Sequence, residues 1–364
     1  MKLGRRSAWR GAFPRAREPA ATATQQRRKF SSRRFHCAFG LLLLAYDPTQ
    51  SALHPGGVQS ARIAALWWTF FWALLVVFIL VMIFLFIGLW RRRLTNEGES
   101  PIIKPGEERG LTRFVTVAVV LTVLTLFALL GRDFVTGNQI FALSDAGALE
   151  IKLTGHQWWW EVQYQDPQPS NIVTTANEIH IPIGRVVKFD LASTDVIHSF
   201  WVPNLHGKKD LVPGHPTTVL LRADEAGEYH GQCAEFCGYQ HAHMRLLIVA
   251  EQPERFQAWL AAQRQDSPPP SNASARLGRQ VFLTSQCVMC HTIGGTRAFA
   301  TLGPNLSHLG SRQTLAAGSF PNTRGYLAGW IVNPQNLKPG AMMPPNLLAP
   351  DSLNALIDYL EALK

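Results

Sequence analysis

Two long apolar stretches lie in the N-terminal part of the chain. Residues 63–90 and residues 114–131 contain no Asp, Glu, Lys or Arg. A helix needs about 20 apolar residues to cross a bilayer, so the first stretch is long enough and the second is adequate. Buried helices of a soluble protein are the alternative, but helices that are apolar all round require lipid or a much larger core. The pattern predicts a transmembrane hairpin within residues 46–135.

A different spacing of apolar residues begins at residue 149 and continues to about residue 250. Apolar and polar residues alternate there in short runs, and Gly, Pro and Asn separate the runs. A period of two with such turns predicts short strands in an all-β sandwich or barrel. The alternating apolar positions include Ile179, Ile181, Ile183, Val187, Phe189 and Leu191. Residues 254–264 have the pattern of a closing helix, which sets the expected domain at residues 149–264.

The last part of the chain is helical in pattern. Residues 265–274 are rich in Pro and Ser, a composition typical of an extended linker. Residues 275–364 then have the length of a further small domain. The sequence thus predicts two globular domains that follow the hairpin and are joined by a linker.

The positive charge of the chain is concentrated at its N-terminus. The formal net charge is +10, and residues 1–45 hold eleven Lys or Arg and one Glu, so the remainder is balanced. A basic leader followed by the short apolar run 37–45 is typical of an export signal, and the charge gives no reason to expect nucleic-acid binding. Six Lys or Arg between the two apolar stretches indicate a cytoplasmic loop. The domains after residue 132 are then expected outside the membrane.

One short loop contains several metal-ligand side chains. Cys233, Cys237, His241 and Met244 fall within twelve residues. Thiolate and thioether are soft ligands that favour Cu(I), and imidazole suits copper in either oxidation state. Two thiolates can bridge two copper ions, whereas zinc is disfavoured because Met is not a zinc ligand. A second imidazole must come from elsewhere, and His198 is the candidate. The loop therefore predicts a dinuclear copper centre.

Two neighbouring residues require a choice. His243 is adjacent to Met244, and neighbours on a strand point to opposite faces. We therefore expect His243 to lie outside the metal ligands or at the surface.

The chain has five cysteines. Two lie in this loop, two lie at positions 287 and 290, where they form a second motif, and the fifth, Cys37, is in the leader, so no pair remains for a structural disulfide.

The C-terminal segment contains a second redox motif. Cys287-Val-Met-Cys290-His291 has the spacing of covalent haem c attachment, with the histidine as an axial iron ligand. A thioredoxin-like redox pair would need a βαβ context, which the sequence does not indicate. The sixth iron ligand is expected to be a methionine that is distant in sequence. Met342 and Met343 are the two candidates.

Taken together, residues 50–364 resemble subunit II of bacterial haem–copper cytochrome c oxidases, in the version with a C-terminal cytochrome c domain. The motifs that carry the resemblance are the hairpin, Gly155-His-Gln-Trp158, residues 195–203, the loop 233–244 and the haem segment. The resemblance implies a multi-domain fold. A two-helix transmembrane hairpin, a cupredoxin-like Greek-key β-barrel and an all-α class I cytochrome c domain follow one another.

The resemblance also implies a set of site residues. Trp158 matches an aromatic residue at the surface where electrons are received, with a structural core or interface role as the alternative. Glu235 is expected to use its backbone carbonyl for copper and its side chain for a magnesium ion at the boundary with subunit I. The implied ligands of the dinuclear CuA centre are His198, Cys233, Glu235, Cys237, His241 and Met244. The implied haem c residues are Cys287, Cys290, His291 and Met343.

The expected function is that of an electron-transfer subunit of a respiratory oxidase. Electrons would pass from an external soluble or membrane-bound donor to haem c, then to CuA, then to haem in subunit I, where dioxygen is reduced to water. Subunit I, subunit III and the lipid bilayer are the expected partners, in a bacterial inner membrane with the C-terminal domains on the periplasmic side. A quinol-oxidase version without copper, a subunit of a copper-containing nitric oxide reductase, and a free-standing membrane redox carrier are the alternatives. Glu107 or Glu108 could match an acid at a proton path or be a solvated loop acid.

Overall fold

The structure is a computed structural model that describes residues 50–94 and 105–364. The predicted leader over residues 1–45, with Cys37, and the middle of the predicted cytoplasmic loop lie outside the described residues, as does the side chain of Glu107.

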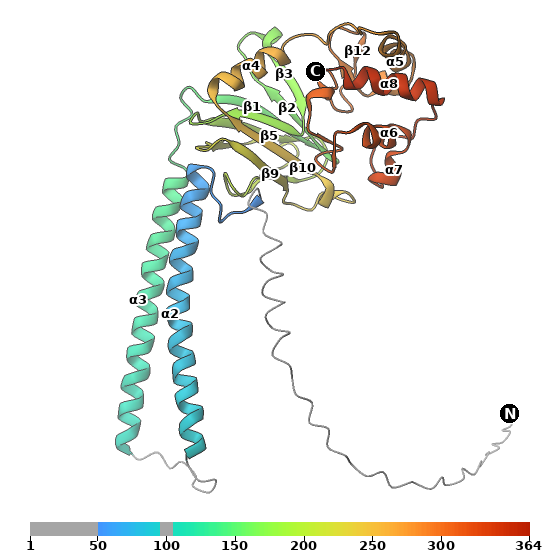
Figure 1. Ribbon diagram of the computed structural model, residues 1–364. Helices are drawn as coiled ribbons and strands as arrows, with labels where there is room; N and C mark the ends of the chain where they lie inside the picture. Colours follow the sequence, from blue (N-terminus) through green and yellow to red (C-terminus); the bar gives the residue numbers. More distant parts are fainter. Residues whose placement is uncertain (1–49, 95–104) are drawn as a thin grey trace, which may run out of the picture. The chain divides into compact units, whose positions relative to one another are not determined.

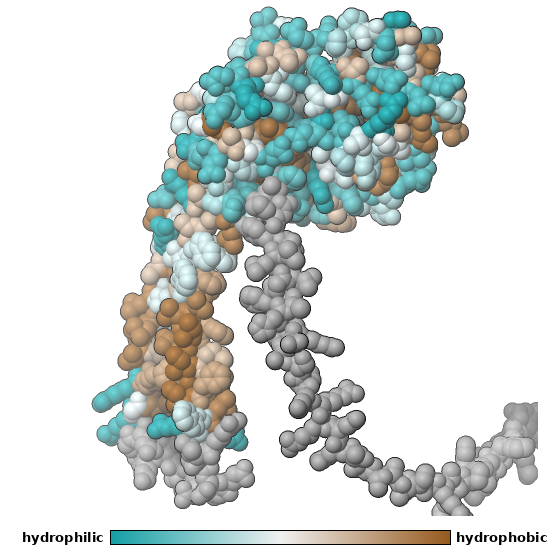
Figure 2. All heavy atoms as spheres, in the orientation of Figure 1, coloured by the Kyte–Doolittle hydropathy of each residue, from teal (hydrophilic) through white to brown (hydrophobic). Residues whose placement is uncertain are grey.

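Two long helices form a hairpin in this part of the chain. Helices α2 (Val58–Leu94) and α3 (Pro105–Ile140) run side by side, and the rings of Phe84 and Phe114 meet at 5.4 Å (Figure 1). Both extend beyond the expected apolar stretches at each end. Their side chains are apolar and mostly exposed, and Figure 2 shows the apolar band over both helices. By length and composition, both helices could cross a membrane.

The first globular domain consists of two five-stranded sheets. Their strand orders are β3-β2-β1-β5-β8 and β4-β10-β9-β6-β7. The first sheet comprises β1 (Leu149–His156), β2 (Trp159–Tyr164), β3 (Val173–Ala176), β5 (Val187–Ser193) and β8 (Thr217–Leu221). The second comprises β4 (Glu178–Pro182), β6 (His198–Trp201), β7 (Lys209–Leu211), β9 (Gly227–Cys233) and β10 (Arg245–Glu251).

The predicted alternation positions the core between these sheets. Val187, Phe189 and Leu191 on β5 are fully buried, and the polar residues between them are not. Ile179 and Ile181 on β4 are buried in the same way, because successive side chains of a strand point to opposite faces. Helix α4 (Pro253–Gln263) follows β10 within a residue of the predicted closing helix.

The second globular domain has its own apolar core. Its helices are α5 (Ala273–Thr284), α6 (Arg324–Val332), α7 (Pro334–Leu337) and α8 (Pro350–Glu361). Phe282 on α5 and Tyr359 on α8 are buried, with rings 6.3 Å apart. Two ribbons that the helical pattern did not predict are β11 (Thr292–Ile293) with β12 (Ala298–Phe299), and β13 (Thr314–Leu315) with β14 (Phe320–Pro321). They are too short to leave a periodic signal.

Candidate metal centres

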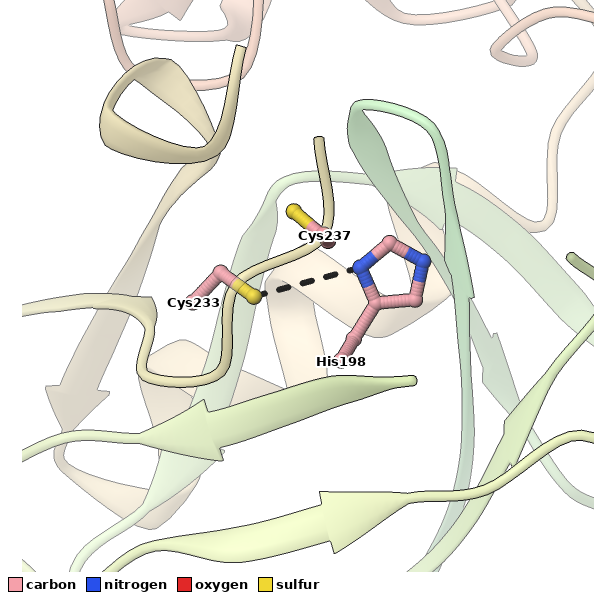
Figure 3. Close-up of side chains that lie close together, drawn as sticks. All are labelled: His198, Cys233 and Cys237. Atoms are coloured by element: carbon pink, nitrogen blue, oxygen red, sulfur yellow. Dashed lines mark hydrogen bonds between the residues drawn. The ribbon is translucent and has the colours of Figure 1, made fainter. Parts of the chain in front are cut away.

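Three predicted copper ligands meet in a buried cluster. The ligand atoms of His198, Cys233 and Cys237 all lie within 4.8 Å of one another, and all three residues are buried. Cys233 Sγ and His198 Nδ1 lie 3.9 Å apart and face each other in Figure 3, with Cys237 beside them. His198 begins β6, Cys233 ends the neighbouring strand β9, and Cys237 follows in the loop.

The remaining predicted ligands surround the same two sulfur atoms. His241 Nδ1 lies 3.6 Å from Cys237 Sγ, and Met244 Sδ lies 3.8 Å from it. The carbonyl oxygen of Glu235 lies 3.2 Å from Cys233 Sγ. The structure therefore brings together two thiols, two imidazoles, a thioether and a carbonyl in one place. This donor set fits copper, and it includes a thioether, which zinc sites do not use.

A short 3₁₀ turn separates the side chains of His243 and Met244. The turn covers His241–His243, after which Met244 is fully buried while His243 is exposed. The opposite orientation of these neighbours agrees with the expectation, although a turn rather than a strand produces it.

Residues that the sequence analysis did not identify hold His198 in place. Asp195 Oδ1 lies 2.8 Å from Nε2 of His198, which leaves Nδ1 directed at the sulfur atoms. A carboxylate on the other ring nitrogen is the usual way in which a metal-binding histidine is oriented. Gly155 on β1 is needed because a Cβ there would lie 2.7 Å from the His198 ring. The three-residue spacing of Asp195 and His198 was the available sequence signal.

The two cysteines share one site and have opposite pKa shifts. A hydrogen bond with Cys237 lowers the pKa of Cys233, although burial opposes this shift. The same neighbour, together with burial, raises the pKa of Cys237. Burial lowers the pKa of His198, but hydrogen bonds with Cys233 and Asp195 outweigh it, so the net shift is upward. These shifts favour the thiolate form at Cys233 and the thiol form at Cys237, and the thiolate is the form that binds metal.

Trp158 lies directly on the copper-ligand loop. Its indole Nε1 donates to the carbonyl of Cys237 at 3.0 Å, and the side chain is half-buried. The neighbouring Gln157 Nε2 donates to the same carbonyl at 2.8 Å. Gln157 also donates its backbone N–H to Asp195 Oδ2 at 2.7 Å, so it links the carboxylate and the loop. Sequence reasoning identified Trp158 but not Gln157.

The haem-attachment motif lies on a single helical turn. The backbone N–H of His291 donates to the carbonyl of Cys287 at 3.0 Å, within the turn Gln286–Met289 and its end. Nδ1 of His291 lies 2.8 Å from the carbonyl of Pro304, which leaves Nε2 for a metal. Burial lowers the pKa of His291, so the ring stays neutral as ligation requires. Gly303 is needed here because a Cβ would lie 2.8 Å from the His291 ring.

The two candidate methionines differ in exposure. Met342 is 80% exposed, whereas Met343 is partly buried and its carbonyl accepts a hydrogen bond from Gln335. The difference favours Met343 as the side chain directed toward the interior.

Two acidic residues named in the sequence analysis lie at the surface. The carboxylate of Glu235 forms an ion pair with Lys208 at 3.6 Å, and Glu108 is exposed.

Comparisons with known proteins agree with this arrangement. Residues 149–251 match the model of the cytochrome c oxidase subunit II periplasmic domain, and residues 275–364 match that of cytochrome c. Cytochrome c oxidase subunit 2 of Alkalihalophilus pseudofirmus is 35% identical over 80% of this chain and 84% of its own length. That of Bacillus sp. (strain PS3) is 28% identical over 76% and 80%.

One solved structure is similar over part of the chain. The periplasmic domain of subunit II of cytochrome oxidase from Bradyrhizobium japonicum is 29% identical to this chain. It covers 32% of this chain and 93% of that one, with a TM-score of 0.30.

The expected fold class is confirmed by the matches and the structure together. Two apolar helices precede a cupredoxin-like domain and a cytochrome c domain, and the two domain families imply CuA copper and haem c. Relatives of this kind are subunits of the haem–copper oxidase complex, in the inner membrane with a periplasmic domain. The chain therefore belongs to the cytochrome c oxidase subunit II family, in the form that carries a fused cytochrome c domain.

Proposed function

We propose that electrons from an external donor reach haem c in the C-terminal domain, pass to CuA, and continue to haem in subunit I for reduction of dioxygen. The observation that carries the proposal is the convergence of four donor atoms on two buried thiol sulfurs, with Cys237 Sγ 3.6 Å from His241 Nδ1 and 3.8 Å from Met244 Sδ. Two coppers held there would share the electron, which would reduce the rearrangement needed at each transfer.

Each proposed copper ligand would supply one donor atom. Cys233 and Cys237 would hold both coppers through their thiolate sulfurs. Single donors come from His198 Nδ1, His241 Nδ1, the Met244 thioether and the carbonyl of Glu235. Asp195 orients His198 and keeps the correct ring nitrogen facing inward. Four of these six residues, His198, Cys233, Cys237 and Met244, are buried in the β-domain, which favours an arrangement of donors that exists before metal binds.

The haem ligands are proposed from the second domain. Cys287 and Cys290 form the thioether attachments, His291 binds iron through Nε2, and Met343 is the sixth ligand. Support comes from the Pro304 carbonyl that holds His291 Nδ1 and from the lower exposure of Met343 compared with Met342. A methionine ligand raises the haem potential, as an electron donor to cytochrome oxidase requires.

Trp158 is proposed as the aromatic group through which electrons reach CuA. The hydrogen bond from its indole to the Cys237 carbonyl supports this role, because it joins the ring to a copper thiolate residue. The side chain of Glu235 is proposed to bind magnesium at the boundary with subunit I. For that it would exchange its exposed ion pair with Lys208, which costs little at the surface.

The proposed topology is multi-pass. Both α2 and α3 cross the inner membrane and the loop between them is cytoplasmic, with subunits I and III as partners. Residues 58–94 and 105–140 contain no histidine that could hold a haem or copper within the bilayer. Dioxygen chemistry is therefore assigned to subunit I.

The purified native complex provides the test. We expect this chain to contribute two coppers and one haem c to the complex, with oxygen uptake when the haem is reduced. Cys233→Ser should abolish the dinuclear copper spectrum, because one thiolate cannot bridge alone. His243→Gln is the matched control, since that exposed side chain binds no metal in our assignment. A normal two-copper spectrum in Cys233→Ser would contradict the proposal. Reduction of nitric oxide by the complex in place of dioxygen would support the reductase alternative.

A further inference from the structure

The cytochrome domain contacts the copper-binding domain through two buried charged side chains. Lys338, before the segment with Met343, and Glu178, on β4, are each only 4% exposed. Charged residues are rarely buried unless partners satisfy them. Neither residue is a proposed ligand, so the site described above does not explain their burial.

The ammonium group of Lys338 joins three separate segments. Its Nζ donates to the carbonyls of His243 at 2.8 Å, Trp158 at 3.0 Å and Ala316 at 3.0 Å. An ammonium group has three N–H donors, so each is used once. Two of the acceptors belong to the copper-binding domain: Trp158 contacts the Cys237 carbonyl, and His243 precedes the proposed ligand Met244. Lys338 thus links the haem-ligand segment to the proposed path of electrons.

Glu178 makes the reciprocal contact from the other domain. Its carboxylate accepts from the backbone N–H groups of Gln313 at 3.0 Å and Thr314 at 2.7 Å, and from the Thr314 hydroxyl at 2.9 Å. Main-chain pairing continues the contact, since the N–H of Arg245 donates to the carbonyl of Ala317 at 3.0 Å. The two charges therefore cross the interface in opposite directions.

Such a contact specifies one docked position. A shift of the domain by one hydrogen-bond length would leave a buried ammonium or carboxylate without partners, which costs far more than loss of a solvated contact. Apolar contacts alone lack this directionality. The interface thus has the means to select a single orientation.

We propose that Lys338 and Glu178 are positioning residues that hold the cytochrome domain in one fixed position on the copper-binding domain, with the Met343 segment held against Trp158. Electron transfer then starts from a docked domain and needs no search by a domain that swings on its linker. This inference rests on the proposed function for its purpose, but the docking itself can be measured independently.

Hydrogen exchange on the full chain in the purified complex is the first measurement. Burial lowers the pKa of Lys338 to about 7, so the experiment belongs at a pH below this value, where the amine carries three donors. In Lys338→Met, we expect the amides of Thr314 and Arg245 to exchange about tenfold faster, since undocking exposes both. Lys364→Met, an exposed lysine of the same domain, is the control and should leave them protected.

A second variant and a second readout distinguish loss of docking from a folding defect. Glu178→Gln changes the other side of the interface with a side chain of the same size, and should raise exchange at Gln313 and Thr314. The copper and haem spectra of both variants should equal those of the wild type. Haem-to-copper electron transfer should be slower by about tenfold and should become dependent on viscosity, as for a domain docked only part of the time.

The outcomes distinguish failure of the docking proposal from failure of the proposed electron-transfer function. If the amides stay protected in both variants, or if the wild-type rate already depends on viscosity, fixed docking is wrong. If Lys338→Met fails to incorporate haem, Glu178→Gln alone decides. A wild-type complex without haem-to-copper transfer would overturn the proposed function, whereas protection of Thr314 and Arg245 would still report docking.

Discussion

At the scale of single residues, the ligands are placed by neighbours that bind no metal. Gly155 leaves the space that the His198 ring fills, and Asp195 holds the ring from the far side. Gln157 and Trp158 together occupy the Cys237 carbonyl. The geometry of the copper ligands therefore depends on residues whose individual types carry little sequence signal.

Gly155→Ala tests this dependence. A Cβ at this position would lie 2.7 Å from His198 Cδ2, so the imidazole must move. We expect a loss of copper occupancy and a destabilisation of about 1–3 kcal/mol, which is typical of overpacking a core. Metal analysis and denaturant unfolding of the full chain are the measurements. Gly325→Ala, where a Cβ meets no atom within 4 Å, should change neither, and full copper in Gly155→Ala would contradict the argument.

The two methionines of the haem segment give a second residue-scale prediction. Met343→Leu should remove the thioether, lower the haem potential and open the iron to carbon monoxide. Met342→Leu changes an exposed side chain of similar volume and should cost less than about 1.5 kcal/mol. Optical spectra of the methionine–iron charge-transfer band distinguish them. Loss of this band in Met342→Leu alone would shift the assignment by one residue.

Ligand identity could be predicted from the sequence more readily than ligand orientation. Cys233, Cys237 and His241 stand close together in the chain, so their chemistry is visible as a motif. His198 lies 35 residues before Cys233 and outside this motif, so the sequence offered it only as the candidate for a second imidazole. The contribution of Gly155 could not be predicted, because a glycine in a sequence does not indicate which side chain packs against it or from which direction.

At the scale of elements, periodicity predicted the strands and helices that bury an apolar face. The alternation in β4 and β5 and the closing helix α4 appear where the pattern places them. The ribbons β11–β12 and β13–β14 were missed, since two-residue strands have no measurable period. Polar residues at both ends of α2 and α3 made the predicted apolar stretches shorter than the helices themselves.

Asp358 on α8 connects three elements of the cytochrome domain. Its carboxylate accepts from Ser274 on α5 at 2.5 Å and from Arg324 on α6 at 2.7 Å. These contacts, the Ser274 hydrogen bond first, lower the pKa of Asp358 below its ordinary value of 3.8. The stabilisation is therefore present above that value and is lost as the pH falls through the lower folded value.

Asp358→Asn should accordingly destabilise the domain at neutral pH and have no effect in strong acid. The Asp358 side chain is 31% exposed, so the expected loss is under about 1 kcal/mol. Denaturant unfolding followed by haem absorbance at several pH values is the measurement. Asp145→Asn, outside this domain, serves as the control. A difference between Asp358→Asn and the wild type that persists in strong acid would contradict the linkage.

At the scale of the whole molecule, the interface between the domains was not predictable from the sequence. The contacts of Lys338 with Trp158 and of Glu178 with Gln313 join residues 180 and 135 positions apart. A lysine before Pro-Gly and a glutamate at the start of a strand both resemble surface residues in a single sequence. Only the folded arrangement reveals that each lies opposite a set of partners in the other domain.

The linker between α4 and α5 provides a test at this scale. Doubling its length with about ten Gly and Ser residues after Pro270 raises the cost of loop closure by about 0.6 kcal/mol, a factor of about three in effective concentration. A domain held by Lys338 and Glu178 stays docked after such a change, so the wild-type rate of haem-to-copper transfer should be unaltered. In Lys338→Met, where docking is weak, the same insertion should slow transfer by about threefold. Flash-induced reduction followed at the copper absorbance measures both rates. An equal slowing in the two backgrounds would mean that the linker, and not the interface, determines where the cytochrome domain lies.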